Sequence, residues 1–382
     1  MNHKKRFLIL TSDSGFGHRS AARSVQKALE AIAPEQVDIL IINPILETDM
    51  PKLWQQMETG YDSRVKNSPK LYRFTYDISD SPQMSKLAGS ALAILLQKNI
   101  KQLIEVYKPD AILSTNQMYN TPVGAILKDE ELKIPFFTVV TDLADVHSMW
   151  FTSGPDKYYV ASEWVLRKAI ENNVPPEKIV ITGIPVDPDF SLIDQRREQL
   201  YEKLGVARGY TNILFVGSVR VENILENLMG LRDVKYPLQA IVITGGDHDL
   251  YEKLQGINFD FPVVLRDYVT NMPEWMAVAD VLTTKAGGLI LSEGMAKGLP
   301  IMLIGYLPGQ EEGNVRYLLA HQAGSLVTNP FELASVLNFW LENDCQRLKS
   351  VAANSKALGH PDSALVIAKE LLAVCELSQR AD

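Results

Sequence analysis

Short apolar runs alternate with helix-forming segments along the whole chain. Between the runs lie segments such as 21–32, whose apolar residues recur with the period of a helix. Strands that alternate with helices predict a parallel sheet covered by helices on both faces. Two successive sets of runs therefore predict an α/β protein with two doubly wound, Rossmann-like sheets. The first set is Phe7–Thr11, Val37–Ile42, Ala111–Ser114, Phe136–Thr141, Tyr158–Ala161 and Ile179–Thr182, and the second is Ile213–Gly217, Gln239–Thr244, Pro262–Leu265, Asp280–Thr283, Ile301–Ile304 and Gly324–Val327.

The length of the chain also favours two domains, because 382 residues exceed what one ordinary hydrophobic core covers. Two prolines and a glycine between Gly183 and Pro188 end the first set of runs, so we place the boundary after Pro185. The expected domains are residues 1–185 and 186–362. Residues 363–382 are expected to form a final amphipathic helix.

The composition is that of an ordinary globular protein, with 46% hydrophobic and 22% charged residues. A net charge of −8 argues against non-specific binding of nucleic acid. The apolar stretches are all shorter than the roughly 18 residues that a membrane-spanning helix needs. Two cysteines, Cys345 and Cys375, have no metal-site spacing, which is typical of a reduced, cytoplasmic protein.

Within the segment 283–314, a short apolar run ends in the pair Gly287-Gly288, where a helix is expected to begin. The free N–H groups of Gly287, Gly288 and Leu289 would then face a diphosphate, since helix N-termini bind anions. Glu293 follows on the same helix and is placed to accept the hydroxyls of a ribose. The alternative interpretation of Glu293 is a solvated helix carboxylate, which its apolar neighbours disfavour.

Other strand ends in the second half carry further candidate ligands. Gly217 and Ser218 follow one strand and can wrap a phosphate. Arg266, Tyr268 and Val269 follow another, where backbone groups can pair with the edge of a nucleobase.

The segment closes on a polar cluster after its second apolar run. Gln310 and Glu311 would supply an amide and a carboxylate to sugar hydroxyls, with Asn314 as a supporting partner. Together, these positions predict a nucleotide-sugar site in the second domain.

The first strand of the chain is followed by a glycine-containing loop and a helix. Glycines at 15 and 17 allow a tight turn, so the backbone near Gly17 can approach a ligand. His18 comes next, and an imidazole, with an ordinary pKa of about 6.5, suits a general base. The alternative interpretation is a histidine that only caps or packs the helix start. The nucleotide-sugar motif in the other half favours catalysis.

A second polar cluster follows the apolar run that ends at Thr141. Asp142 could orient a base, and His147 could itself be a base or bind the acceptor. The alternative is an aspartate that caps the next turn. The surrounding residues lack a recognisable metal spacing, so we expect no metal.

These motifs resemble the diacylglycerol glycosyltransferases, both the monogalactosyldiacylglycerol synthase type and the processive diacylglycerol β-glucosyltransferase type. That family is related to the peptidoglycan N-acetylglucosaminyltransferase. Matching stretches cover most of the chain. They are the loop with His18, the TDL…H..WF stretch from Thr141, the GIPV of Gly183–Val186, the YVTNMPEWM of Tyr268–Met276, the TK-x-GG from Thr284 and the PGQE from Pro308.

The resemblance implies a GT-B fold, in which two Rossmann-like domains face each other across a cleft that holds a UDP-sugar. It implies a first domain that faces the acceptor and the membrane and carries the catalytic loop, and a second that binds the donor. By motif position, His18 would be the base, Glu293 the ribose ligand, and Gln310 and Glu311 the hexose ligands. The final helix would cross back to the first domain.

The reaction that the resemblance implies is inverting and needs no metal or other cofactor. A hexose would pass from UDP-glucose or UDP-galactose to the sn-3 hydroxyl of 1,2-diacylglycerol, at an anionic membrane surface on the cytoplasmic, inner face. A basic, apolar stretch around Leu87–Leu96, with Lys86, Lys98 and Lys101, is a candidate contact with that surface. The alternative is a core helix of the first domain. The sequence does not indicate which oligomeric state the protein has.

The sequence departs from the family pattern at three places. Phe16 replaces a small residue of the loop, Asn116-Gln117 replaces a His-Pro or Phe-Pro pair, and Ile290 replaces a threonine. The first two put acceptor recognition in question, and the third removes a possible phosphate donor.

Alternative functions remain at this point. They are a UDP-sugar transferase with a polyprenyl-linked or other glycolipid acceptor, a UDP-sugar 2-epimerase, and a catalytically silent UDP-sugar sensor. A sensor would need Glu293 and Gln310 but not His18.

Overall fold

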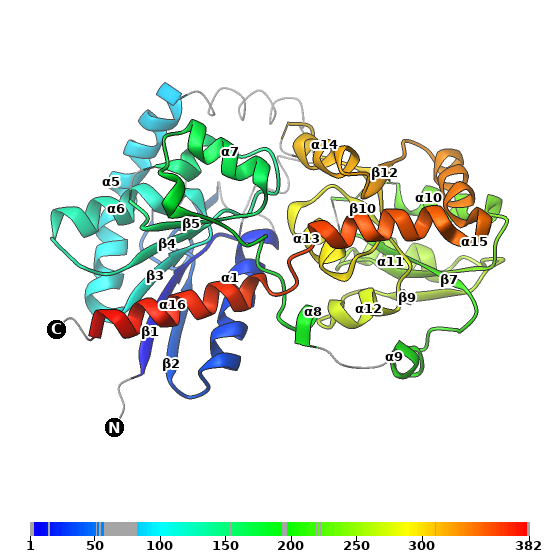
Figure 1. Cartoon of the computed structure of the whole chain (residues 1–382), viewed down its shortest axis with the longest axis horizontal. Helices are drawn as coiled ribbons and strands as arrows, with labels where there is room; N and C mark the ends of the chain where they lie inside the picture. Colours follow the sequence, from blue (N-terminus) through cyan, green and yellow to red (C-terminus); the bar gives the residue numbers. More distant parts are fainter. Residues whose placement is uncertain are drawn as a thin grey trace. The chain divides into compact units, whose positions relative to one another are not determined.

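The computed structural model describes residues 4–13, 16–50, 52, 55–56, 82–152, 154–192, 197–218, 220–221, 223–309 and 311–379. Contacts divide the chain into two compact units, each built on a parallel sheet (Figure 1). The first unit comprises Met1–Pro188, Pro308–Gln310 and Asp362–Asp382, and the second comprises Asp189–Leu307 and Glu311–Pro361.

The sheet of the first unit has the strand order β2-β1-β3-β4-β5-β6, with all neighbours parallel. β1 stands between β2 and β3, so the chain winds outward from β1 in both directions. Such a reversal of winding is where ligands bind in open α/β sheets. The strands are β1 (Lys5–Leu10), β2 (Val37–Ile42), β3 (Ala111–Ser114), β4 (Phe136–Val139), β5 (Lys157–Val160) and β6 (Ile179–Ile181).

Helices cover both faces of this sheet. The side chains of β1 alternate, so Phe7 and Ile9 belong to one buried cluster while Leu8 and Leu10 belong to another. The helices of this unit are α1 (Phe16–Ile32), α5 (Pro82–Tyr107), α6 (Asn120–Asp129), α7 (Glu163–Glu171) and α16 (Ser363–Gln379), together with the short 3-10 helices η1 (Gln117–Tyr119), η2 (Ser148–Phe151) and η3 (Pro176–Lys178).

The C-terminal helix α16 completes the core of the first unit. It lies beside α1 in Figure 1, and its fully buried Ile367 and Leu371 join the cluster of Phe7 and Ile9. The last helix of the chain therefore packs on the first strand and first helix.

The sheet of the second unit has the order β12-β11-β10-β7-β8-β9, again with all neighbours parallel. The winding reverses here between β7 and β10. The strands are β7 (Thr211–Val216), β8 (Leu238–Ile243), β9 (Val263–Arg266), β10 (Val281–Lys285), β11 (Ile301–Gly305) and β12 (Gly324–Leu326).

The helices of the second unit pack on this sheet around a second core, to which β7, β8, α10 and α15 contribute. They are α8 (Asp189–Leu192), α9 (Arg197–Leu204), α10 (Ile224–Gly230), α11 (His248–Gln255), α12 (Met272–Val278), α13 (Gly288–Lys297), α14 (Glu312–Ala320) and α15 (Pro330–Leu358), with η4 (Leu231–Asp233). Each predicted apolar run corresponds to one strand, and the predicted α/β class with two Rossmann-like domains is confirmed.

Candidate functional site

His18 lies where the winding of the first sheet reverses. β1 and β3 end side by side there, and the hydroxyls of Thr11 and Thr115, just beyond the two strands, are 3.0 Å apart. Helix α1 starts from the loop after β1 and carries Gly17 and His18 in its first turn. A Cβ placed on Gly17 would meet no atom of the described residues within 4 Å.

The His18 imidazole is held by partners from two other strand ends. Its Nδ1 lies 2.7 Å from the Thr115 carbonyl oxygen and 2.8 Å from Thr141 Oγ1. A carbonyl oxygen can only accept, so Nδ1 carries the proton and donates it. The neutral ring then has its lone pair on Nε2. This is the tautomer that a general base at Nε2 requires.

Asp142 reaches His18 through a tryptophan. Its carboxylate accepts a hydrogen bond of 2.7 Å from Nε1 of the fully buried Trp150. The Trp150 ring in turn lies 6.3 Å from the His18 ring, centre to centre, at an angle of 43°. Asp142 was predicted to orient a base. In the structure its carboxylate instead orients Trp150, whose ring is a neighbour of His18.

The Asp142 carboxylate titrates above its ordinary range. Burial raises its pKa to about 6, although the hydrogen bond from Trp150 opposes the shift and the nearby Asp145 adds to it. A proton therefore binds to Asp142 more tightly in the folded chain than in the unfolded chain.

His147 has a local structural role. Its Nδ1 accepts the N–H of Met149 at 3.2 Å and so caps η2, and its side chain is buried. Because the lone pair is on Nδ1, the neutral ring has its proton on Nε2. His147 can donate a hydrogen bond from Nε2, whereas a role as base is not compatible with this tautomer.

A charged network beside His18 was not foreseen from the sequence. Arg19, the next residue on α1, forms a bidentate ion pair with Asp13 and donates to Glu47 at 2.8 Å. Asn43 donates to Asp13 at 3.0 Å. Burial acts to raise the Asp13 pKa, but the bonds from Arg19 and Asn43 outweigh it and lower the pKa. The network ties the loop after β1 to the loop after β2.

In the second unit, the loops that follow β7 and β8 approach each other closely. The Gly217 N–H donates to the Ile243 carbonyl at 2.8 Å, and a Cβ on Gly217 would lie 2.6 Å from Ile224 Cδ1. Gly245 has a φ of +66°, and a Cβ there would overlap the Gly217 carbonyl oxygen. Gly217 was predicted, and Gly245 was missed, although the sequence Thr-Gly-Gly-Asp after a strand indicates such a turn.

The loop after β9 is tied to the loop after β8. The Arg266 carbonyl accepts the Thr244 N–H at 3.0 Å, and the Asp267 carbonyl accepts the Gly245 N–H at 2.7 Å. The Arg266 guanidinium lies over the Trp275 ring, at 5.3 Å from its centre. Part of the backbone predicted to read a nucleobase is thus already used within the protein.

Two further residues of that loop keep contact with solvent. Tyr268 is 66% exposed and Val269 is partly exposed. Ser218 is also partly exposed, and its Oγ accepts the Arg220 N–H at 3.3 Å.

Helix α13 begins at the reversal point of the second sheet, directly after β10. Gly287 is its N-cap and supplies no side-chain hydrogen bond, so Gly288 and Leu289 begin the helix with N–H groups that have no intrahelical partner. Glu293 lies on the same helix and is partly exposed. Gly288 and Leu289 were predicted to face a diphosphate, and Glu293 a ribose. Gly287 was predicted to offer its N–H to the diphosphate as well, but this N–H donates to the Lys285 carbonyl at 2.8 Å.

Glu311 is used inside the protein. Its side chain is buried, its Oε1 pairs with the Lys285 ammonium, and its Oε2 accepts the Leu307 N–H at 2.8 Å. Asn314 Nδ2 donates to the Ala286 carbonyl at 2.9 Å. Each oxygen of Glu311 thus already has one partner within the protein, and its role as a ligand of sugar hydroxyls stays a prediction. Gln310 lies outside the described residues.

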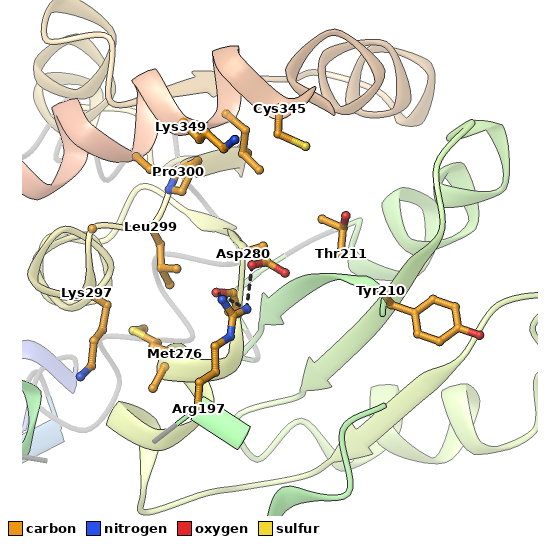
Figure 2. Close-up of a pocket in the computed structure, with 15 residues that line it drawn as sticks. Arg197, Tyr210, Thr211, Met276, Asp280, Lys297, Leu299, Pro300, Cys345 and Lys349 are labelled. Carbon is orange, nitrogen blue, oxygen red and sulfur yellow. Dashed lines mark hydrogen bonds and ion pairs between the residues drawn. The ribbon is translucent and has the colours of Figure 1, made fainter. Parts of the chain in front are cut away.

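A cavity of about 620 Å³ opens at the amino ends of the strands of the second sheet (Figure 2). Thr211, Asp280 and Pro300 line it, and these residues precede or begin β7, β10 and β11. Arg197 bridges the cavity wall by donating to Asp280 at 2.7 Å, and Asp280 accepts the Asn212 N–H at 2.8 Å. The cavity therefore lies at the amino ends of the strands, away from the predicted nucleotide ligands.

The predicted membrane contact falls partly outside the described side chains. Of its lysines, Lys98 is exposed, and Lys101 pairs with Glu130 and, at 3.9 Å, with Glu105. Among the described residues, none of the helices is both long and apolar enough to cross a membrane. In the same part of the chain, His, Cys, Asp and Glu side chains form no group of three that could hold a metal ion.

Two family models match the chain in succession. Residues 18–186 match the monogalactosyldiacylglycerol synthase family, and residues 213–365 match the C-terminal domain of glycosyltransferase family 28. The first match begins at His18, and the second spans every candidate nucleotide ligand of the second unit.

Solved structures with a similar fold include MurG of Acinetobacter baumannii, with a TM-score of 0.62, 13% identity, and coverage of 97% of this chain and 99% of that one. The glycotransferase of kitacinnamycin gives a TM-score of 0.59 at 13% identity, covering 98% of this chain and all of the other. The expected GT-B fold is thereby confirmed.

Curated relatives match over nearly the whole chain. Monogalactosyldiacylglycerol synthase 3 of Arabidopsis thaliana is 30% identical over 387 residues, which cover 98% of this chain and 83% of the relative. The Spinacia oleracea synthase is 29% identical, covering 96% of this chain and 72% of its own length. This chain therefore belongs to the monogalactosyldiacylglycerol synthase family of glycosyltransferases.

Proposed function

We propose that this protein transfers a hexose from a UDP-sugar to the sn-3 hydroxyl of 1,2-diacylglycerol. The family and the names of its members support a diacylglycerol acceptor and favour galactose as the hexose. The observation that carries the proposal is the tautomer of His18, whose Nδ1–H is fixed by the Thr115 carbonyl at the reversal point of the first sheet.

The proposed chemistry is a single displacement at the anomeric carbon. Nε2 of His18 takes the proton of the acceptor hydroxyl as its oxygen attacks that carbon from the face opposite UDP. The bond between the anomeric carbon and the diphosphate oxygen breaks, and UDP leaves with the electron pair. One displacement inverts the configuration of the anomeric carbon.

The charge that develops on the leaving diphosphate needs stabilisation. The N–H groups that begin α13 would supply it, because they are fixed before the reaction starts and need no reorganisation. Glu293 would bind the ribose hydroxyls from the same helix. We expect transfer to continue in EDTA, and a loss of transfer that Mg²⁺ or Mn²⁺ restores would contradict this part of the proposal.

The substrate assignment is tested by supplying labelled donors to the pure protein with vesicles that contain diacylglycerol. UDP-galactose and UDP-glucose are tested separately, and lipid products are resolved by chromatography. We expect label in a monohexosyldiacylglycerol, and more of it when the vesicles contain an anionic lipid. That last result would support the proposal that the protein acts at an anionic membrane surface.

The same assay separates the alternatives. Label that stays in a water-soluble sugar nucleotide with altered configuration would indicate an epimerase. Label in lipid only when a polyprenyl-linked or glycolipid acceptor is added would replace diacylglycerol as the substrate. Binding of UDP-sugar without any turnover would indicate a sensor.

A further inference from the structure

A buried ion pair lies beside the start of α13 and has no role in the chemistry described above. Lys285, the last residue of β10, has a side chain that is 14% exposed, and that of its partner Glu311 is 7% exposed. Removing two charges from water costs about as much as their attraction returns, so a buried pair adds little stability by itself. Its location points to a function.

Gly287 leaves the ammonium accessible from the start of the helix. A Cβ at this position would lie 3.3 Å from Lys285 Nζ and 3.7 Å from Glu311 Oε1. The backbone of Gly287, at φ −70° and ψ 135°, is one that any residue adopts, so conformation does not demand a glycine. The missing side chain instead opens a path to the ammonium beside the first N–H groups of α13.

The local charges favour an anion at this place. The N-terminus of a helix carries a partial positive charge, so a cation beside it is unfavourable unless negative charge is also present. Glu311 provides one negative charge and is held in place by the Leu307 N–H. The helix end and the ammonium together can still accept the charge of a diphosphate.

We propose that the Lys285 ammonium binds the diphosphate of the UDP-sugar together with the first N–H groups of α13, and that Glu311 is the counter-ion that balances the charge of the ammonium before the diphosphate binds. This inference rests on the proposed function and adds a charged group to its donor site. The ammonium stays protonated throughout and stabilises the oxygen that gains charge as the sugar–phosphate bond breaks.

Calorimetry with UDP and with uridine tests the inference, because uridine lacks the diphosphate. Lys285→Met should weaken UDP binding at least about tenfold and change uridine binding less than about twofold. Glu311→Gln keeps an oxygen for the Leu307 N–H and removes a negative charge, so UDP should bind at least as tightly as in the wild type. Lys349→Met, which removes an exposed lysine from the cavity of Figure 2, is the matched control and should change neither affinity.

The two halves of the pair thus have opposite expected effects on UDP. Parallel weakening of UDP and uridine by both variants would reduce the pair to a structural link and overturn the inference. So would wild-type UDP affinity in Lys285→Met. If that variant does not fold, weaker UDP binding in Glu311→Gln alone overturns it.

UDP binding needs no acceptor, so this test is independent of transfer. A chain that binds UDP through Lys285 but moves no hexose keeps this inference and refutes the proposed function. Transfer that persists in Lys285→Met with unchanged UDP affinity refutes this inference and keeps the proposed function.

Discussion

His18 shows which properties of a site residue can be predicted from the sequence and which cannot. Its position after the first strand predicted a base, but its tautomer depends on Thr115 and Thr141, which are 97 and 123 residues away. Such partners are set by the order of the strands in the sheet, and a single sequence does not contain that order. The same holds for Glu311, whose oxygens are taken by groups that only the folded loops bring together.

The Thr141 hydroxyl should tune the base without contacting substrate. Thr141→Val removes one of the two Nδ1 partners, so we expect kcat to fall about tenfold, which corresponds to one weakened hydrogen bond, with KM for the UDP-sugar unchanged. Thr141→Ser should restore kcat. Thr138→Val, which removes a different buried hydroxyl on β4, is the control. Full activity of Thr141→Val would show that Thr115 alone positions the ring.

The raised pKa of Asp142 makes stability depend on pH. The pKa of Asp142 is about 6 in the folded protein and an ordinary 3.8 in the unfolded chain. Its contribution to the free energy of unfolding is therefore fully present below about pH 4 and is lost as pH rises through 6. The loss is at most about 3 kcal/mol and is reduced by the remaining solvent contact of the side chain. Asp142→Asn should therefore gain stability over the wild type as pH rises from 5 to 7.5, measured by urea unfolding.

Activity of the same variant separates two roles for Asp142. Asparagine still offers an oxygen to Trp150 Nε1, so transfer should stay within about tenfold of the wild type. A folded Asp142→Asn protein without activity would mean that the carboxylate itself acts on the base. An equal stability difference at both pH values would contradict the pKa.

At the scale of elements, the strands were predictable and the loop contacts were not. Buried parallel strands are continuous apolar runs, so β1 and β7 are visible in the sequence. The close approach of the loops after β7 and β8 is visible only as the Gly245-Gly246 pair, whose two members have different tasks. Gly245 has another backbone against it, whereas a Cβ on Gly246 would meet no atom of the described residues within 4 Å.

These neighbouring glycines provide a matched test of loop packing. Both have positive φ, +66° and +85°, so alanine strains each by about 1 kcal/mol. Gly245→Ala also drives a Cβ into the Gly217 carbonyl, and should cost several kcal/mol more than Gly246→Ala in thermal or urea unfolding and weaken UDP binding. Equal destabilisation by the two would contradict the close approach of the loops.

At the scale of the whole molecule, the chain returns to its beginning. The sequence predicted α16 as an amphipathic helix, and family resemblance supplied the expectation that it crosses back. In the structure, α16 buries Leu371 against the core of β1 and α1. The first unit therefore needs both ends of the chain.

Removing one buried side chain of α16 should loosen the first unit alone. Leu371→Ala should cost about 2–5 kcal/mol through lost burial and a cavity, whereas Lys369→Ala, exposed on the same helix, should cost less than about 0.5 kcal/mol. Hydrogen exchange should quicken in peptides from β1 and α1 and stay unchanged in peptides from β7. Equal acceleration in β7 would show that the units unfold together.

The central claim is that His18 acts as the base of a hexosyl transfer in a protein that binds UDP through a separate unit. The most direct measurement compares transfer from labelled UDP-hexose to diacylglycerol by the wild type and by His18→Ala, with UDP affinity measured in parallel. We expect transfer to fall at least about a hundredfold while UDP affinity stays within about twofold. Transfer by His18→Ala at the wild-type rate would contradict the account.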